Sequence, residues 1–217
     1  MNIMKNIIRV FMIVAIAVGL WSVMQLTASA DTTNSVMYKD ADGNTSAAPE
    51  CKIVESSGAV DWDSGWYAVT KNTVITGRIT LRNDVNLILC DGAKLTVSPD
   101  YDSNGISMLY YNLNVFEGKT TRKFGGTLYV SANGEHEGLL GDGSQGEIGI
   151  FGGTVLANYD SDTHTAKNGS SSGISTSKIT IGGGSTVCSY NGQSTGIGMY
   201  GANEIKIFGS DTKVYVN

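Results

Sequence analysis

The chain has 217 residues, of which 41% are hydrophobic and 16% are charged, with 28 glycines and only 2 prolines. Glycine without a three-residue period excludes collagen, and low charge with this apolar content excludes a disordered chain. Residues 1–30 carry Lys5 and Arg9 and no acid, so the rest has 13 positive and 20 negative side chains, a net charge of −7. Such a surface repels phosphate backbones, so we predict no nucleic acid among the partners.

The first 30 residues predict a signal peptide. Lys5 and Arg9 precede an unbroken apolar run of 12 residues, Val10–Trp21, and Ala28–Ala30 offers small residues for cleavage. As a helix this run spans about 18 Å, which is short for the ~30 Å core of a bilayer. We therefore expect a secreted or extracellular protein of the cell surface that meets the membrane only through this segment. The alternative is an uncleaved N-terminal anchor, because apolar residues continue to Leu26.

Three cysteines follow, Cys51, Cys90 and Cys188, which is an odd number for an exported chain. There is no Cys-x-x-Cys, and the spacings do not match those of zinc sites. One disulfide and one buried thiol is the simplest account. We predict the disulfide between Cys51 and Cys90, where it would tie the N-terminal segment to the first regular strands.

A sequence pattern recurs five times between residues 86 and 210. Its copies are Asn86–Gly92, Asn112–Gly118, Glu147–Gly153, Lys178–Gly184 and Glu204–Ser210. The second and fourth positions are aliphatic in every copy, and this alternation predicts a strand with one buried face. Ile150, Ile181 and Ile207 are therefore expected to point into the core.

Two further elements accompany the copies. A second strand is predicted at Lys94–Val97, Thr127–Val130, Thr154–Ala157, Thr186–Ser189 and Thr212–Val216, and a short third one begins at Gly105, Gly138, Gly173 and Gly196. Three short strands per repeat without helical periodicity predict an all-β fold of the parallel β-solenoid type. A β-sandwich is the competing fold, but the connections are mostly too irregular for two-residue hairpin turns.

The segments Gly65–Val69, Val74–Thr80 and Asp84–Thr96 resemble the opening of β-helix domains in secreted and surface proteins of anaerobic bacteria. Such domains are similar to the pectin-lyase-like superfamily, and some are called carbohydrate-binding domains. The resemblance covers roughly residues 60–217. It implies a right-handed parallel β-helix at a bacterial cell surface and no settled activity.

Paired acids suggest a calcium site along one edge of the solenoid. The loops after three successive second strands carry acids two residues apart, namely Asp100 and Asp102, Glu135 and Glu137, and Asp160 and Asp162. Stacking would align these loops, and calcium accepts carboxylate oxygens as ligands. The alternative is an acidic, solvated rim that keeps the protein soluble, since no loop has the spacing of an EF-hand.

Exposed aromatic rings are the candidates for binding polysaccharide. Tyr129 occupies the outward phase of its strand, and Tyr101, Tyr159 and Tyr190 lie in or beside the acidic loops. Alternatively, these tyrosines cover the backbone at the edge of the solenoid.

Other aromatic residues are expected to be structural. Phe116, Phe151 and Phe208 share one position of the repeat, which predicts a stacked ladder. Trp62 and Trp66 are expected to close the N-terminal end of the core.

An enzyme is the alternative to a binding protein, because polysaccharide lyases and hydrolases use this fold. A lyase needs a basic residue to abstract a proton, and the candidates are in the loop Lys119–Lys123, which is expected to be a solvated turn. His136 and His164 have no Ser or Cys at a spacing that predicts a triad. We therefore assign no catalytic residue.

The expected organisation is a signal peptide at 1–30, an N-terminal linker and cap at 31–60 and the β-helix at 61–217. An uncovered strand edge at the last repeat predicts that these residues are part of a longer surface protein. These features favour binding or adhesion to a polysaccharide or cell-wall glycan, with calcium as the one candidate ion. A structural stalk without its own ligand is a further alternative.

Overall fold

The computed structural model describes residues 35–119, 124–134, 136–141, 145–160, 165–166, 172–190 and 199–216. All regular elements in these ranges are β-strands, and most of them pair in parallel, which confirms the all-β class. The predicted signal peptide lies outside the described residues. Within them, no helix has the length and apolar character that crossing a membrane requires.

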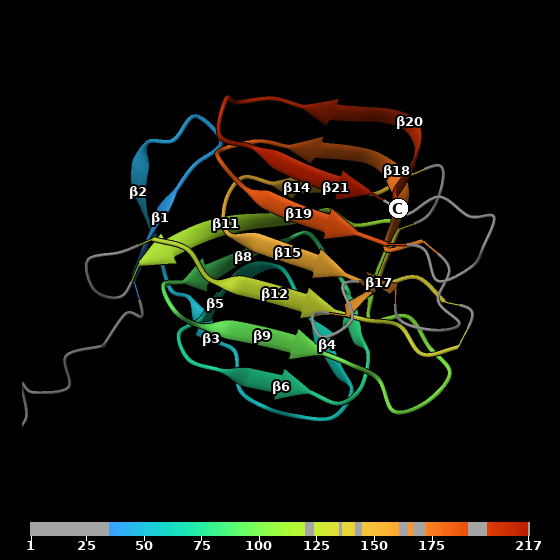
Figure 1. The fold of residues 1–217 in the computed structure, drawn as a ribbon. Helices are drawn as coiled ribbons and strands as arrows, with labels where there is room; N and C mark the ends of the chain where they lie inside the picture. The colour runs from blue at the N-terminus through green and yellow to red at the C-terminus, as the bar shows by residue number, and fades with distance from the viewer. Residues whose placement is uncertain are drawn as a thin grey trace, which may run out of the picture. The chain divides into compact units, whose positions relative to one another are not determined.

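Sheet B, as we call the smaller parallel sheet, contains six strands in chain order (Figure 1). They are β6 (Thr73–Ile75), β9 (Lys94–Val97), β12 (Thr127–Val130), β15 (Thr154–Ala157), β19 (Thr186–Ser189) and β21 (Lys213–Val216). From β9 onward, corresponding residues of successive strands stand opposite one another. The second strands of the repeat therefore form the sheet with the predicted bounds, except that the last one begins one residue later.

Sheet A, the larger sheet, has 13 strands and combines two parallel series. One series is β3 (Lys52–Ile53), β5 (Gly65–Val69), β8 (Val85–Cys90), β11 (Leu113–Lys119) and β14 (Glu147–Ile150), and the other is β4 (Val60–Trp62), β7 (Ile79–Leu81), β10 (Ile106–Leu109) and β13 (Leu139–Gly141). The long strand β18 (Ile174–Ile181) pairs with both β13 and β14, so it joins the two series. The last strand, β20 (Met199–Ile207), pairs with β18 along its length.

The short third strands of the repeat begin where the sequence predicts in three of the four copies. β10, β13 and the beginning of β18 follow Gly105, Gly138 and Gly173 as expected. The fourth, predicted at Gly196, lies outside the described residues. The residue that pairs with Ile174 is Met199, so the repeat resumes two residues later than predicted.

The aliphatic positions of the repeat form the core in four of the five copies, where they are at most 1% exposed. The prediction is wrong for the fifth copy, in which Ile205 is 45% and Ile207 is 52% exposed. The reason is that β20 pairs on one edge only, with β18, and no other described strand covers its second edge.

The segment predicted to be a linker and cap contains an antiparallel hairpin, β1 (Val36–Lys39) and β2 (Thr45–Ala48), that joins sheet A. Strand β1 also pairs with β11. The Tyr38 ring lies 4.7 Å from Trp66 and 5.0 Å from Phe116, measured between ring centroids. Trp66 is therefore covered by the hairpin instead of closing the end of the core.

The remaining aromatic predictions hold in part. Trp62 is 3% exposed and stacks on Tyr67 near the first strands, as expected of a residue at that end. Phe116 and Phe151 form a ring pair at 5.5 Å, but Gly182 occupies the next position of the ladder. The ring of Phe208 fills the space where a Gly182 side chain would lie. A last antiparallel pair, β16 (Tyr159–Asp160) and β17 (Thr165–Ala166), follows β15.

Candidate functional site

The outward face of sheet B presents two rows of side chains. Leu95, Leu128 and Val155 are fully buried, so their neighbours in the strands point away from the core. One row, here called the threonine row, consists of Lys94, Thr127, Thr154, Thr186 and Lys213. The other, called the tyrosine row, consists of Thr96, Tyr129, Leu156, Cys188 and Tyr215.

Tyr129 lies in the tyrosine row as the alternation of its strand predicts. The residues on either side of it, Leu128 and Val130, are fully buried, whereas Tyr129 is half-buried on the outward face. The Nζ atom of Lys94 is 5.0 Å from the centroid of the Tyr129 ring. Tyr215, at the end of the same row, is 53% exposed. The face thus combines flat aromatic surface with hydroxyl and ammonium donors.

One polar groove runs beside the threonine row, and a second groove adjoins it. The first has a volume of about 340 Å³, and its lining includes Lys94, Thr127 and Thr154 together with five glycines at the strand entrances, Gly92, Gly125, Gly126, Gly153 and Gly184. The second, of about 590 Å³, is lined by residues that include Lys39, Asp42, Phe208 and Asp211. Glu117 and Gly184 line both grooves. The space next to Gly92 is open, since nothing lies within 4 Å of a Cβ atom built there, whereas a Cβ atom at Gly126 would meet neighbouring backbone.

The other three tyrosines predicted to bind ligand lie elsewhere. The rings of Tyr159 and Tyr190 pair at a centroid distance of 5.0 Å beyond the carboxyl ends of β15 and β19, opposite the end that borders the grooves. Tyr101 is 44% exposed, and its hydroxyl accepts a hydrogen bond of 3.2 Å from the Arg78 backbone N–H. The four tyrosines therefore do not form one patch.

The predicted calcium ligands are only partly within the described residues. Glu135 and Asp162 lie outside them, and Asp160 is described by its backbone alone. Asp102 is close to His136, with 3.4 Å between Oδ1 and Nε2, and is largely exposed. The backbone N–H of Asp100 donates to the Thr76 carbonyl at 3.2 Å, and that of Glu137 to Asn104 Oδ1 at 3.0 Å.

No group of three or more His, Cys, Asp or Glu suited to a metal ion occurs in the described part of the chain. The calcium site stays a prediction.

All three cysteines are free thiols in the structure. Burial raises the pKa of Cys51 and of Cys188, and it raises the pKa of Cys90 to about 11, with smaller contributions from the charges of Asp91 and Cys51. Cys51 Sγ contacts the Ala48 carbonyl at 3.9 Å, next to the β1–β2 hairpin. The disulfide between Cys51 and Cys90 stays a prediction.

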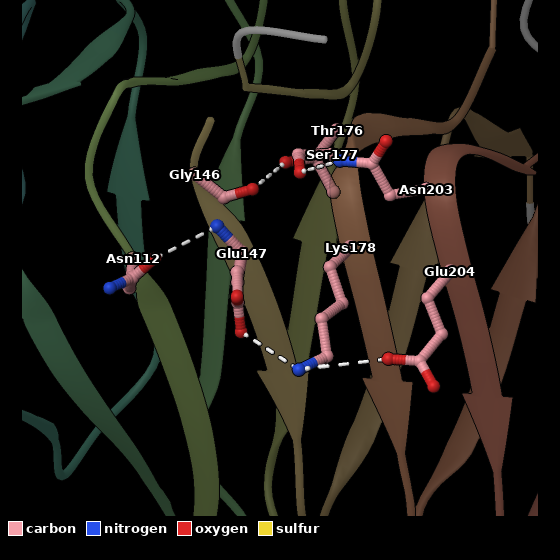
Figure 2. Close-up of polar contacts among 8 residues, drawn as sticks. All are labelled: Asn112, Gly146, Glu147, Thr176, Ser177, Lys178, Asn203 and Glu204. Atoms are coloured by element: carbon pink, nitrogen blue, oxygen red, sulfur yellow. Dashed lines mark hydrogen bonds and ion pairs between the residues drawn. The ribbon is translucent and has the colours of Figure 1, made fainter. Parts of the chain in front are cut away.

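A polar ladder on sheet A is a feature that the sequence reasoning did not single out (Figure 2). Lys178 Nζ lies 3.4 Å from Glu147 Oε2 on one side and 3.7 Å from Glu204 Oε2 on the other. The Glu147 backbone N–H donates to Asn112 Oδ1 at 2.9 Å. These four residues are the first positions of successive repeat copies, so comparing the copies column by column would have revealed the ladder.

The residues considered for catalysis are mostly beyond the described ranges. Arg122, Lys123 and His164 lie outside them. Lys119 Nζ lies 4.9 Å from the centroid of the Phe124 ring, and His136 faces Asp102. Among the described residues, His136 thus has a carboxylate beside it, and no Ser or Cys nucleophile is assigned to this pair.

Comparisons of the chain with protein-family models, with curated proteins and with solved structures found no match.

Proposed function

We propose that this chain is an exported, right-handed parallel β-helix that binds a polysaccharide or cell-wall glycan at the surface of a bacterial cell. The N-terminal segment with its apolar run supports export. Three parallel series of strands, in which each strand pairs with its counterpart 15 to 35 residues away, support the β-helix. The right-handed sense follows from the general preference of connections between parallel strands.

The observation that carries the proposed ligand is the outward face of sheet B with its grooves. The threonine row offers a hydroxyl on each of three neighbouring strands, about 4.8 Å apart, with lysines at both ends. An extended glycan repeats its own hydroxyls and ring faces on a similar length scale. The Tyr129 ring gives the C–H face of a sugar a flat apolar surface, and the glycine-lined groove gives the polymer room.

A binding titration with single substitutions tests this proposal. The full chain is examined by calorimetry and affinity gel electrophoresis against polygalacturonate and soluble cell-wall glycans. Tyr129→Ala is expected to weaken binding about ten-fold, because it removes the aromatic surface. Lys94→Ala is expected to weaken binding to acidic glycans more than to neutral ones, because it removes a cation.

Tyr110→Ala is the matched control. Tyr110 is 60% exposed between β10 and β11, away from sheet B, so its removal is expected to leave the affinity unchanged. Equal losses for Tyr110→Ala and Tyr129→Ala would refute the assignment to sheet B. Absorbance at 232 nm in the same mixtures would identify a lyase, and the absence of both retention and product would favour a structural stalk.

A further inference from the structure

One charged side chain belongs to both grooves beside sheet B. Glu117 lies near the end of β11 and lines each of them, and its side chain is only 15% exposed. In the three later copies of the repeat the same position is a glycine, namely Gly152, Gly183 and Gly209. A carboxylate therefore stands at the junction of the two grooves, at a position where the later copies have no side chain.

The two oxygens of this carboxylate have different surroundings. Oε1 forms an ion pair with Nζ of Lys39, which comes from the β1–β2 hairpin and also lines the second groove. Oε2 lies beside Gly125 of the first groove, because a Cβ atom built at Gly125 would be 3.8 Å from Oε2 and would meet no other atom within 4 Å outside its chain neighbours. The stem of the side chain packs on Gly152, where a Cβ atom would be 2.6 Å from Glu117 Cγ. One oxygen is thus held by a lysine, and the other borders open space in the groove.

The ion pair combines two opposite hydrogen-bonding roles. An ionised carboxylate only accepts hydrogen bonds, and an ammonium group only donates them. Lys39 and Glu117 therefore present a donor and an acceptor side by side, with no net charge. Two hydroxyls on adjacent carbons of a sugar match this arrangement, because one can donate to Oε2 while the other accepts from Nζ. Hydrogen bonds of this kind, to charged groups, are stronger than those between neutral groups.

We propose that Lys39 and Glu117 form a subsite for a vicinal diol, so that the glycan bound here carries free hydroxyls on adjacent carbons. This inference rests on the proposed function and names the class of sugar within it. A 1,4-linked glucose polymer keeps its 2- and 3-hydroxyls free. A 1,3-linkage uses the 3-hydroxyl and leaves no adjacent pair on the residues within the chain, so the subsite favours the 1,4-linked polymer.

The hairpin has other contacts that hold it on sheet A. Strand β1 pairs with β11, and the Tyr38 ring packs on Trp66. Glu117 is also far more buried than the acids of two surface ion pairs, Glu55 at 62% and Asp61 at 54% exposed. Burial of a charge costs desolvation that the attraction within the pair only partly offsets. The place of this pair at both grooves is therefore better explained by a ligand than by stability.

Two hexasaccharides of the same composition test the subsite, cellohexaose with 1,4-linkages and laminarihexaose with 1,3-linkages. Calorimetry on the full chain is expected to show about ten-fold tighter binding of cellohexaose, the effect of one hydrogen bond to a charged group. Glu117→Gln keeps the size of the side chain and removes its charge, so this variant is expected to lose most of the preference. A preference that came from the shape of the sugar chain alone would survive the substitution and would overturn the proposal.

Glu147→Gln is the matched control. Glu147 also pairs with a lysine, Lys178, but it lines neither groove, so its substitution is expected to leave both affinities unchanged. Thermal unfolding shows whether each variant is folded. Lys39→Met removes the donor of the pair and keeps the length of the side chain, so it is expected to reduce the preference as well and tests the subsite even if Glu117→Gln does not fold.

Failure of the subsite and failure of the proposed function give different results. Binding of polygalacturonate without any preference between the two hexasaccharides, or an unchanged preference in Glu117→Gln, would refute the diol subsite and leave the glycan-binding function standing. If the unsubstituted chain binds none of these glycans, both are wrong.

Discussion

An isoleucine at the fourth position of the repeat is fully buried in β14 and in β18, but half of its surface stays exposed in β20. Ile150, Ile181 and Ile207 share their chemistry and their place in the pattern. The difference lies in the number of neighbouring strands, because β14 and β18 have one on each side. Burial at this position is therefore a property of the stack and not of the residue.

The contrast predicts different costs for one substitution at two equivalent positions. Ile150→Ala should lower the free energy of unfolding by about 2–5 kcal/mol, because it leaves a cavity in a packed core. Ile207→Ala should lower it by about 1 kcal/mol or less, since its side chain is 52% exposed. Urea denaturation of the two variants and of the unsubstituted chain measures both values. Equal losses would contradict the observed burial.

The Cys90 thiol makes the stability depend on pH in the alkaline range. Its pKa is about 11 in the folded chain, mainly because of burial, against about 9 when exposed. Between these values the unfolded chain loses the proton and the folded chain keeps it, so the free energy of unfolding falls as the pH rises from 9 to 11. The loss should be about 2 kcal/mol.

The test is to denature the unsubstituted chain and Cys90→Ala under reducing conditions across this pH range. The difference between the two isolates the contribution of the Cys90 thiol from that of all other ionisable groups. A Cys90→Ala variant with an equally steep fall would show that other groups are responsible.

At the scale of the elements, the corners between sheets A and B determine how closely neighbouring strands approach. Gly126, at the entrance of β12, has no room for a side chain, because a Cβ atom there would lie 2.4 Å from the Cys90 carbonyl oxygen and 2.9 Å from that of Ala93. Backbone atoms of a sheet are held by hydrogen bonds, so they cannot move aside as the end of a flexible side chain can. The same corner borders the first groove, so the shape of the groove depends on this close approach of the two backbone segments.

Gly126→Ala is therefore expected to destabilise the protein by about 2 kcal/mol or more, through displacement of β12 from the preceding corner. Gly58→Ala is the matched control, because nothing lies within 4 Å of a Cβ atom at Gly58 and its φ is not positive. Thermal unfolding of the two variants measures the difference. A stable Gly126→Ala protein that also keeps its glycan affinity would contradict this account of the corner.

At the scale of the whole described unit, the two ends of the strand series differ. The terminal strands of the two sheets, β4 and β6 at one end and β20 and β21 at the other, each pair with one strand. At the first end the segment around Ser57 also hydrogen-bonds to the outer edge of β6, and no described segment does so at β20 or β21. Strands with few buried contacts open at a lower free energy than central ones. The molecule is therefore expected to open from the β20–β21 end.

Hydrogen exchange measured on a dilute sample should reveal this order. Amides of β20 and β21 are expected to exchange fastest among the strands of the two sheets, and those of β8 and β11 slowest. Uniform protection along the strands of the dilute sample would contradict the predicted asymmetry.

Five of the six strands of sheet B could be predicted almost residue by residue, because alternation with period two and a threonine or lysine near each start survive in every copy. The pairing of Met199 with Ile174 could not be predicted, because the connection before Met199 differs in length from those of the other copies. Within the candidate site, the outward direction of Tyr129 follows from its strand. The grooves and the pairing of Tyr159 with Tyr190 depend on how separate strands stack, which no single segment encodes.

The sequence by itself determined the all-β class, the recurring strands and the inward phase of their aliphatic residues, because these depend on local alternation alone. The tertiary structure decided which of those residues are buried, that the hairpin of β1 and β2 covers Trp66, and that threonines from three strands form one row. These features need residues that are tens of positions apart to meet. Their contact depends on strand pairing, which a local pattern permits but does not specify.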